Sequence, residues 1–217
     1  EKPAGDIELT FRTAKGEVIK SFSSKIEETP KDETGITSPF APEEKKEPHL
    51  TKEAGANRFV WNMRYPDATK VPGDKGRLST DGITTGPLVP PGAYQVTLKV
   101  GDWTQTQTFE IRKDPRVTTS DADLVAQFDF LLGVRNKLSE THESINKIRN
   151  TKTQVEEWIK RVEGQASAKA IGDAGKALKE KLSAIEEELI QAKAADPRSF
   201  PSRLNARLAI LGNLMES

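Results

Sequence analysis

The strongest constraint on the fold of this chain is an abrupt change in residue usage at Asp114-Pro115. Eleven of the 13 prolines and ten of the 15 glycines lie at or before this point. The rest of the chain is rich in Ala, Leu, Glu and Lys, which favour helices, whereas Pro and Gly favour turns between short strands. The sequence therefore predicts two domains, all-β and then all-α: residues 1–113, a linker at 114–117, and residues 118–217.

The first domain shows the two-residue period of strands. Five segments alternate apolar and polar residues over strand-like lengths: 7–11, 18–22, 57–65, 94–100 and 103–112. In the third segment, Phe59, Trp61 and Met63 are expected on the buried face. Two stretches rich in Pro, Gly and charge, 27–53 and 66–91, are expected to be long loops. The pattern predicts an immunoglobulin-like antiparallel β-sandwich.

The second domain repeats its apolar residues at helical steps of three and four. Three helices are predicted, at about 119–163, at about 166–193 and from Pro201 onward. Ser120 and Asp123 resemble a cap for the first helix, and a break near Asn150 is the alternative to one long helix. The second helix has one apolar stripe: Ile171, Ala174, Leu178, Leu182, Ile185 and Leu189. Because each stripe is only about 100° wide, an antiparallel, up-down-up bundle is expected to cover all three.

Charge and hydropathy exclude two classes of partner. The chain has 33 basic and 33 acidic residues, a formal net charge of zero and a pI of about 7.1. This balance provides no electrostatic footprint for nucleic acid. No run of 18 apolar residues occurs, so membrane insertion is not expected.

Few residues are suited to catalysis or metal binding. Cysteine is absent, and His49 and His142 have no metal-ligand spacing to each other. Asp67, Asp74 and Asp81 are spaced by seven residues and do not follow the ligand order of an EF-hand loop. No phosphate-binding glycine motif and no nucleophile elbow occurs. We therefore predict no catalytic residue, no metal site and no cofactor, and we do not expect this chain itself to be an enzyme.

Six residues are candidates for contact with a ligand or a partner: Tyr65, Trp103, Trp158, Leu211, Leu214 and Met215. Tyr65 and Trp103 lie at strand ends, where an exposed ring can stack on a sugar or pack against a neighbouring domain. Trp158 is expected in the bundle core or at the edge of an interface. The last three keep helical register near the C-terminus and form an apolar strip without a cover. A second copy could cover it, giving a homodimer through helices.

Three motifs carry a resemblance to known proteins. They are GANRFVWNMRYP at 55–66, the stretch from Gly86-Pro87 to Pro91-Gly92-Ala93-Tyr94, and Asp114-Pro115-Arg116. With them, nearly the whole chain resembles the region that follows the β-propeller in bacterial proteins described as glycosyl-hydrolase, BNR-repeat or sortilin-like propeller proteins. The first half is also similar to the immunoglobulin-like domain of the flagellar hook-capping family, in which a Trp-bearing strand precedes a Pro-Gly-x-Tyr strand.

The resemblance implies a neighbour rather than an activity. The expected partner is a β-propeller domain of the same protein that this sequence lacks, and the expected setting is an exported, periplasmic or secreted, bacterial protein. The chain would be a non-catalytic accessory region that braces the propeller or mediates protein–protein assembly. The alternative is a carbohydrate-binding module serving a glycosidase, which requires coplanar exposed aromatics. A third hypothesis, completion of a hydrolase active site, requires a polar cleft with converging carboxylates.

Overall fold

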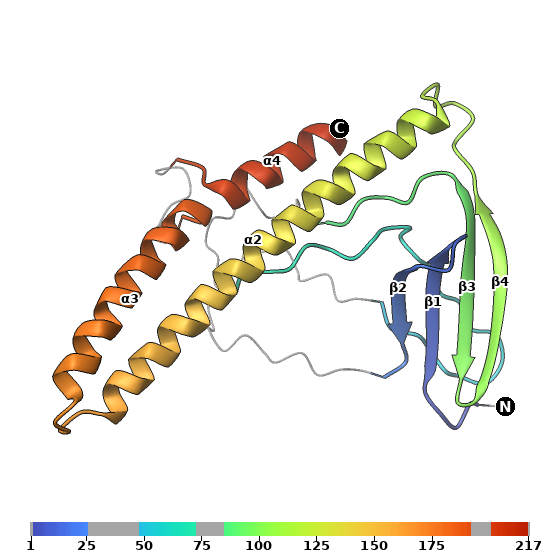
Figure 1. Cartoon of the computed structure of the whole chain (residues 1–217). Coiled ribbons are helices and arrows are strands. Elements are labelled where there is room, and N and C mark those ends of the chain that lie inside the picture. Colours follow the sequence, from blue (N-terminus) through green and yellow to red (C-terminus); the bar gives the residue numbers. More distant parts are fainter. Residues whose placement is uncertain (1, 26–47, 73–84, 192–200, 217) are drawn as a thin grey trace, which may run out of the picture. The chain divides into compact units, whose positions relative to one another are not determined.

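The chain folds into two compact units of different secondary structure. The computed structural model describes residues 2–25, 48–72, 85–191 and 201–216. One unit comprises Glu1–Met63 with Pro90–Thr118, and the other comprises Arg64–Val89 with Thr119–Ser217. The first contains a four-stranded antiparallel sheet and the second contains three helices (Figure 1), so the predicted order of β and then α is confirmed. Much of the two predicted loops, together with Asp74 and Asp81, lies outside the described residues.

The sheet is built from two hairpins in the order β2-β1-β3-β4 (Figure 1). Its strands are β1 (Ile7–Thr13), β2 (Val18–Ser23), β3 (Gly92–Val100) and β4 (Trp103–Ile111). Gly16 (φ 87°) and Gly101 (φ 57°) make the tight reversals, because glycine adopts positive φ without a steric penalty. The central strands β1 and β3 pair from Ile7 opposite Val100 onward. A second sheet, which the predicted sandwich requires, is not among the described residues.

One face of the sheet carries an aromatic core. The ring of Phe11 stacks on Trp61 with a centroid distance of 4.2 Å and meets Phe22 edge-on at 6.0 Å. Phe59 lies 4.7 Å from Phe22, and Phe109 lies 6.2 Å from Phe11. The prediction that Phe59 and Trp61 face the core is therefore confirmed.

The segment that carries these two rings is not the predicted third strand. Residues 57–63 have no strand pairing, and Arg64 forms only an isolated bridge with Leu88. Met63, expected on the buried face, is 43% exposed and has a φ of 57°, so the alternation ends there. Alternating residues describe any extended segment, and such a segment can lie on a sheet without joining its ladder.

The second unit contains the helices α2 (Asp121–Arg161), α3 (Ala168–Leu189) and α4 (Leu204–Glu216). The predicted cap of α2 is confirmed, because the Ser120 Oγ accepts a hydrogen bond from the Asp123 N–H at 3.1 Å. The helix continues through Asn150 for 41 residues, so the alternative of a break there is wrong. At 1.5 Å per residue it is roughly 60 Å long.

The helices α3 and α4 pack one after the other along α2 (Figure 1). Lys179 of α3 pairs with Glu156 in the last part of α2, and Gln127 near its start donates a hydrogen bond to the Met215 carbonyl of α4. Both therefore run antiparallel to α2, and the predicted up-down-up order is wrong. The arrangement is a helical hairpin whose second arm is interrupted. Among the described residues, no third helix covers the whole α3 stripe, and Ile185 is 53% exposed.

Residues 64–72 and 85–89, here called the strap, belong to the helical unit. The two parts of the strap pair with each other through the Tyr65 N–H, which donates to the Pro87 carbonyl at 3.0 Å. A Cβ on Gly86 would lie 2.1 Å from the Tyr65 carbonyl oxygen, so this approach requires glycine.

The strap also contributes to the core of the helical unit. Ala68 packs with Leu138 and Ala209, which joins α2 to α4. Val71 packs with Ile145 and Ile190 where α3 ends. The predicted first domain, residues 1–113, is therefore corrected, because residues 64–72 and 85–89 group with the helices.

Candidate interaction surface

A row of polar side chains on α2 binds the strap. The row is Ser139, His142, Glu143, Asn146 and Arg149. Thr69 is at its centre: its N–H donates to the Ser139 Oγ at 3.1 Å, and its carbonyl accepts from the His142 Nδ1 at 2.5 Å. The strap's backbone groups are thus satisfied by helix side chains rather than by a sheet. These residues have a structural role.

His142 is only 2% exposed and is not arranged as a metal ligand. A carbonyl oxygen only accepts, so the bond to Thr69 places the ring proton on Nδ1. The other ring nitrogen, Nε2, is buried and has no hydrogen-bond partner among the residues that the structure describes. Within the part of the chain that the structure describes, no cluster of His, Asp and Glu side chains could hold a metal ion.

A buried ion-pair cluster joins α2 to α3. The Glu186 side chain is 6% exposed and accepts from the Arg149 Nε at 2.8 Å and from the Lys152 Nζ at 3.0 Å. Burial raises the pKa of Glu186, but the hydrogen bonds and charges of Arg149 and Lys152 together outweigh it, and the net pKa is below the usual value. A carboxylate held ionised in this way is unsuited to act as a general acid near neutral pH.

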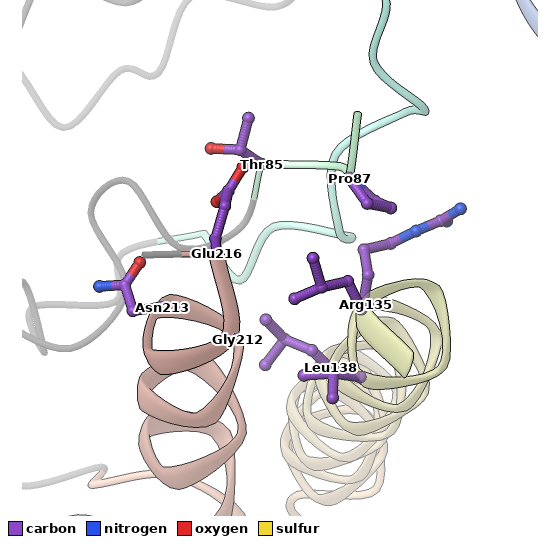
Figure 2. A pocket seen from close by; sticks show the side chains of 9 residues that line it. Thr85, Pro87, Arg135, Leu138, Gly212, Asn213 and Glu216 are labelled. Atoms are coloured by element: carbon purple, nitrogen blue, oxygen red, sulfur yellow. The ribbon is translucent and has the colours of Figure 1, made fainter. Parts of the chain in front are cut away.

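A cavity between α2, α4 and the strap is shown in Figure 2. It is lined by Thr85, Pro87, Leu131, Val134, Arg135, Leu138, Gly212, Asn213 and Glu216. Its volume is about 20 Å³, enough for roughly one water molecule. Burial lowers the pKa of Arg135, an effect that Tyr65 and Asp67 oppose. A sugar ring or a peptide side chain does not fit this space.

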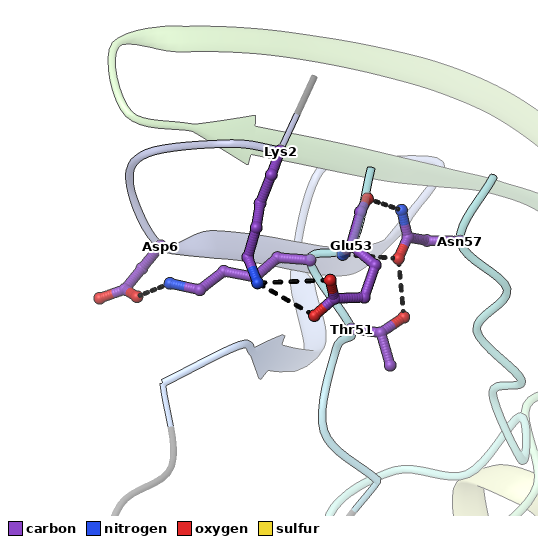
Figure 3. Close-up of polar contacts among 6 residues, drawn as sticks. Lys2, Asp6, Thr51, Glu53 and Asn57 are labelled. Atoms are coloured by element: carbon purple, nitrogen blue, oxygen red, sulfur yellow. Dashed lines mark hydrogen bonds and ion pairs between the residues drawn. The ribbon is translucent and has the colours of Figure 1, made fainter. Parts of the chain in front are cut away.

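Polar contacts in the first unit fix the turn at 51–57 (Figure 3). The Asn57 Oδ1 accepts from the Glu53 N–H at 3.1 Å, and the Asn57 Nδ2 donates to the Glu53 carbonyl at 2.9 Å. Lys2 pairs with Glu53 at 3.1 Å and Lys52 with Asp6 at 3.2 Å. Exposed ion pairs of this kind each stabilise the fold by at most about 1 kcal/mol. The role of these side chains is to hold the turn.

The three aromatic candidates lie in different surroundings. Tyr65 is half-buried against Phe128, with ring centroids 5.1 Å apart, so it is not an exposed ring at a strand end. Trp158 is 59% exposed, and the Arg161 guanidinium lies 5.4 Å from its ring centroid. Trp103 is 51% exposed at the start of β4 and is the one exposed aromatic among the described residues of the first unit. Within the helical unit, Tyr65 and Trp158 therefore do not form a shared platform.

The C-terminal candidates are exposed, and α3 carries further exposed large apolar side chains. We define the apolar helical surface as Ile171, Leu178 and Ile185 of α3 with Leu204, Leu211, Leu214 and Met215 of α4, all at least 37% exposed. The three residues of α3 are seven positions apart and share one face of that helix. Exposed apolar groups at this spacing are typical of a helix face that binds another protein.

Two features of this unit were missed by sequence reasoning. The α3 stripe was expected to be buried between helices, but an uninterrupted seven-residue spacing also describes a face for an external partner. The strap-binding row of α2 was missed because polar residues beside an apolar stripe usually face solvent. Its signal is the repeated three- and four-residue spacing of polar side chains in the middle of a long helix.

The comparisons with known proteins identify no relative. No family model, no curated protein and no solved structure matches this chain. Among the described helices, none is long and apolar enough to cross a membrane. The surfaces described above are therefore the basis for a functional proposal.

Proposed function

We propose that this chain is a non-catalytic accessory region that binds another protein domain. The observation that carries the proposal is the apolar helical surface. Its residues Ile185 and Leu211 are 53% and 40% exposed although each lies on a helix that contacts α2. Exposing such side chains to water costs free energy that a partner would recover.

The proposed partner is a β-propeller domain of the same protein, and the proposed role is to brace it or to mediate assembly. The resemblance at residues 55–66, 86–94 and 114–116 supports this choice, and an exported bacterial protein is the proposed setting. We also propose that the four-stranded sheet is one layer of an immunoglobulin-like sandwich. Its antiparallel order, with an aromatic core on one face, supports that topology.

The test is a titration of this chain with the segment encoded directly before Glu1, followed by isothermal calorimetry. We expect saturable binding that Ile185→Glu weakens at least about tenfold, because a carboxylate is then desolvated against apolar groups. Ala184→Glu is the matched control: it adds the same charge at an exposed neighbouring position, about 100° around the helix, and should leave binding unchanged.

A glycan panel provides the opposing outcome. If the chain binds one sugar at micromolar affinity and ignores the upstream segment, the carbohydrate-binding alternative replaces this proposal. Trp103→Ala would then abolish sugar binding, because Trp103 is the exposed ring of the first unit.

A further inference from the structure

The outer edge of β4 is long and regular, and its one charged residue, Glu110, lies near its end and pairs with Arg112 of the same chain. β4 is last in the order β2-β1-β3-β4, and its register with β3 is continuous over nine residues. Its sequence WTQTQTFEI contains no Pro and no Lys. The other edge, β2, is shorter, carries Lys20 and has a register shift opposite Phe11/Arg12. Natural sheets use such devices to prevent edge pairing, and among the described residues β2 carries more of them than β4 does.

The hairpin geometry determines which backbone groups of β4 face outward. Val100 pairs with Trp103 across the two-residue turn Gly101-Asp102. In an antiparallel ladder closed by such a turn, the flanking pair exchanges hydrogen bonds, and alternate residues then point their N–H and C=O away from the neighbour. On β4 the outward residues are therefore Thr104, Thr106, Thr108 and Glu110. In the part of the chain that the structure describes, no strand pairs with them.

We propose that this edge pairs with β4 of a second copy, antiparallel, about a two-fold axis at Gln107. This register overlaps the whole strand and places Trp103, which is 51% exposed, opposite Ile111 of the second copy. Just beyond the strand ends it places Asp102 opposite Arg112, so opposite charges meet at both ends. The result is a continuous sheet through both copies.

The charges at the strand ends also favour this register over the two registers that are shifted by two residues. Only shifts of two residues keep outward groups opposite outward groups. A shift one way places Asp102 opposite Glu110, and a shift the other way places it opposite Asp114. Both alternatives bring like charges together, whereas the proposed register does not. The partner that fits the β4 edge is therefore β4 of a second copy, and the opposite charges of Asp102 and Arg112 support this choice.

Single-cysteine crosslinking of the full chain tests the register, because the chain contains no cysteine. Gln107→Cys places two thiols at the axis in a non-hydrogen-bonded pair, where Cα atoms are about 4.5 Å apart and a disulfide can form. Thr104→Cys, opposite Glu110, is the control, and its two thiols would lie roughly 20 Å apart. We expect mild oxidation to convert the Gln107→Cys chain, and not the Thr104→Cys chain, to a covalent dimer.

A charge exchange gives a second, independent measurement. Asp102→Lys and Arg112→Glu should each weaken self-association about tenfold, because both end pairs become repulsive. Mixing the two variants should restore association, since each mixed end pair again joins opposite charges. Equal crosslinking at positions 104 and 107, or no preference for the mixed pair in sedimentation equilibrium, would overturn the inference. Ile185→Glu should not affect this association, so its outcome is separable from that of the proposed function.

Discussion

At the residue scale, the Glu186 cluster shows how a buried carboxylate stabilises the helical unit. Glu186→Gln removes the charge that faces Arg149 and Lys152. We expect a loss of about 1 to 3 kcal/mol in the free energy of unfolding at pH 7. Glu180→Gln, at an exposed position of the same helix, should change it by less than about 0.5 kcal/mol.

The pH dependence of that difference has a definite sign. The folded pKa of Glu186 is below its usual value, so the ionised carboxylate stabilises the fold at pH values above the unfolded pKa of about 4.3. The stabilisation is lost as the pH falls through the folded pKa. Urea unfolding of wild type and Glu186→Gln should therefore differ at pH 7 and converge in acid. A constant difference down to acid pH would contradict the assignment.

Gly86 is the second residue whose identity the structure explains. Because an added Cβ would lie 2.1 Å from a backbone oxygen, no side-chain rotation relieves the clash. Gly86→Ala should lower the free energy of unfolding of the helical unit by about 2 to 4 kcal/mol. A Cβ added at Gly133 on α2 would have no atom within 4 Å. Gly133→Ala should therefore raise the free energy of unfolding by about 0.5 to 1 kcal/mol. Similar effects of the two changes would show that the strap is not closely paired at this point.

At the element scale, the helices could be predicted from the sequence but their arrangement could not. The helical period and the Ser120 cap are local signals, and they gave the helix bounds to within a few residues. Gly164, with a φ of 83°, lies just after the end of α2. The direction of α4 depends on how the chain crosses from Ile190 to Leu204. No local signal in the sequence tells whether α4 runs in the same direction as α3 or in the opposite direction. An up-down-up bundle was therefore expected, whereas the structure has an interrupted hairpin.

The close packing of α2 against α3 makes a prediction about two glycines of α3. A Cβ on Gly175 would lie 2.8 Å from the Ile159 Cδ1, whereas Gly172 has nothing within 4 Å. Gly172→Ala should stabilise the chain by about 0.5 to 1 kcal/mol through helix propensity. Gly175→Ala should gain less or lose stability, because Ile159 and Val155 must move. Equal gains in chemical denaturation would contradict the packing.

At the scale of the whole molecule, the division into units could not be read from composition. Residues 64–72 and 85–89 resemble a loop because they carry Pro, Gly and few large apolar side chains. Their buried apolar residues, Ala68, Val71 and Val89, are small, and the packing of Ala68 and Val71 becomes visible only beside Leu138 and Ile145. Among the contact candidates, Tyr65 was chosen because an exposed ring was expected at a strand end, but it packs on Phe128. The three candidates on α4 were chosen because they keep helical register in an apolar strip, and they are exposed.

Val71→Asp tests whether the strap belongs to the helical unit. A carboxylate at a site 8% exposed should cost about 2 to 4 kcal/mol. We expect the loss in the helical signal at 222 nm rather than in the fluorescence of Trp61 in the sheet unit, measured with Trp103 and Trp158 replaced by Phe. Lys70→Asp adds the same carboxylate at the exposed neighbouring residue and serves as control. If only the Trp61 fluorescence changed, the strap would belong to the first unit and not to the helical unit.

The most direct test of the account is side-chain footprinting of the chain with and without the upstream segment. Hydroxyl radicals oxidise exposed side chains in proportion to their access, and mass spectrometry locates the oxidised residues. At saturation we predict that oxidation of Ile185, Leu211 and Met215 falls several-fold, while Val18, 54% exposed in the sheet unit, is unchanged. Unchanged oxidation of the three helical residues in a saturated complex would contradict the claim that the apolar helical surface is the binding surface.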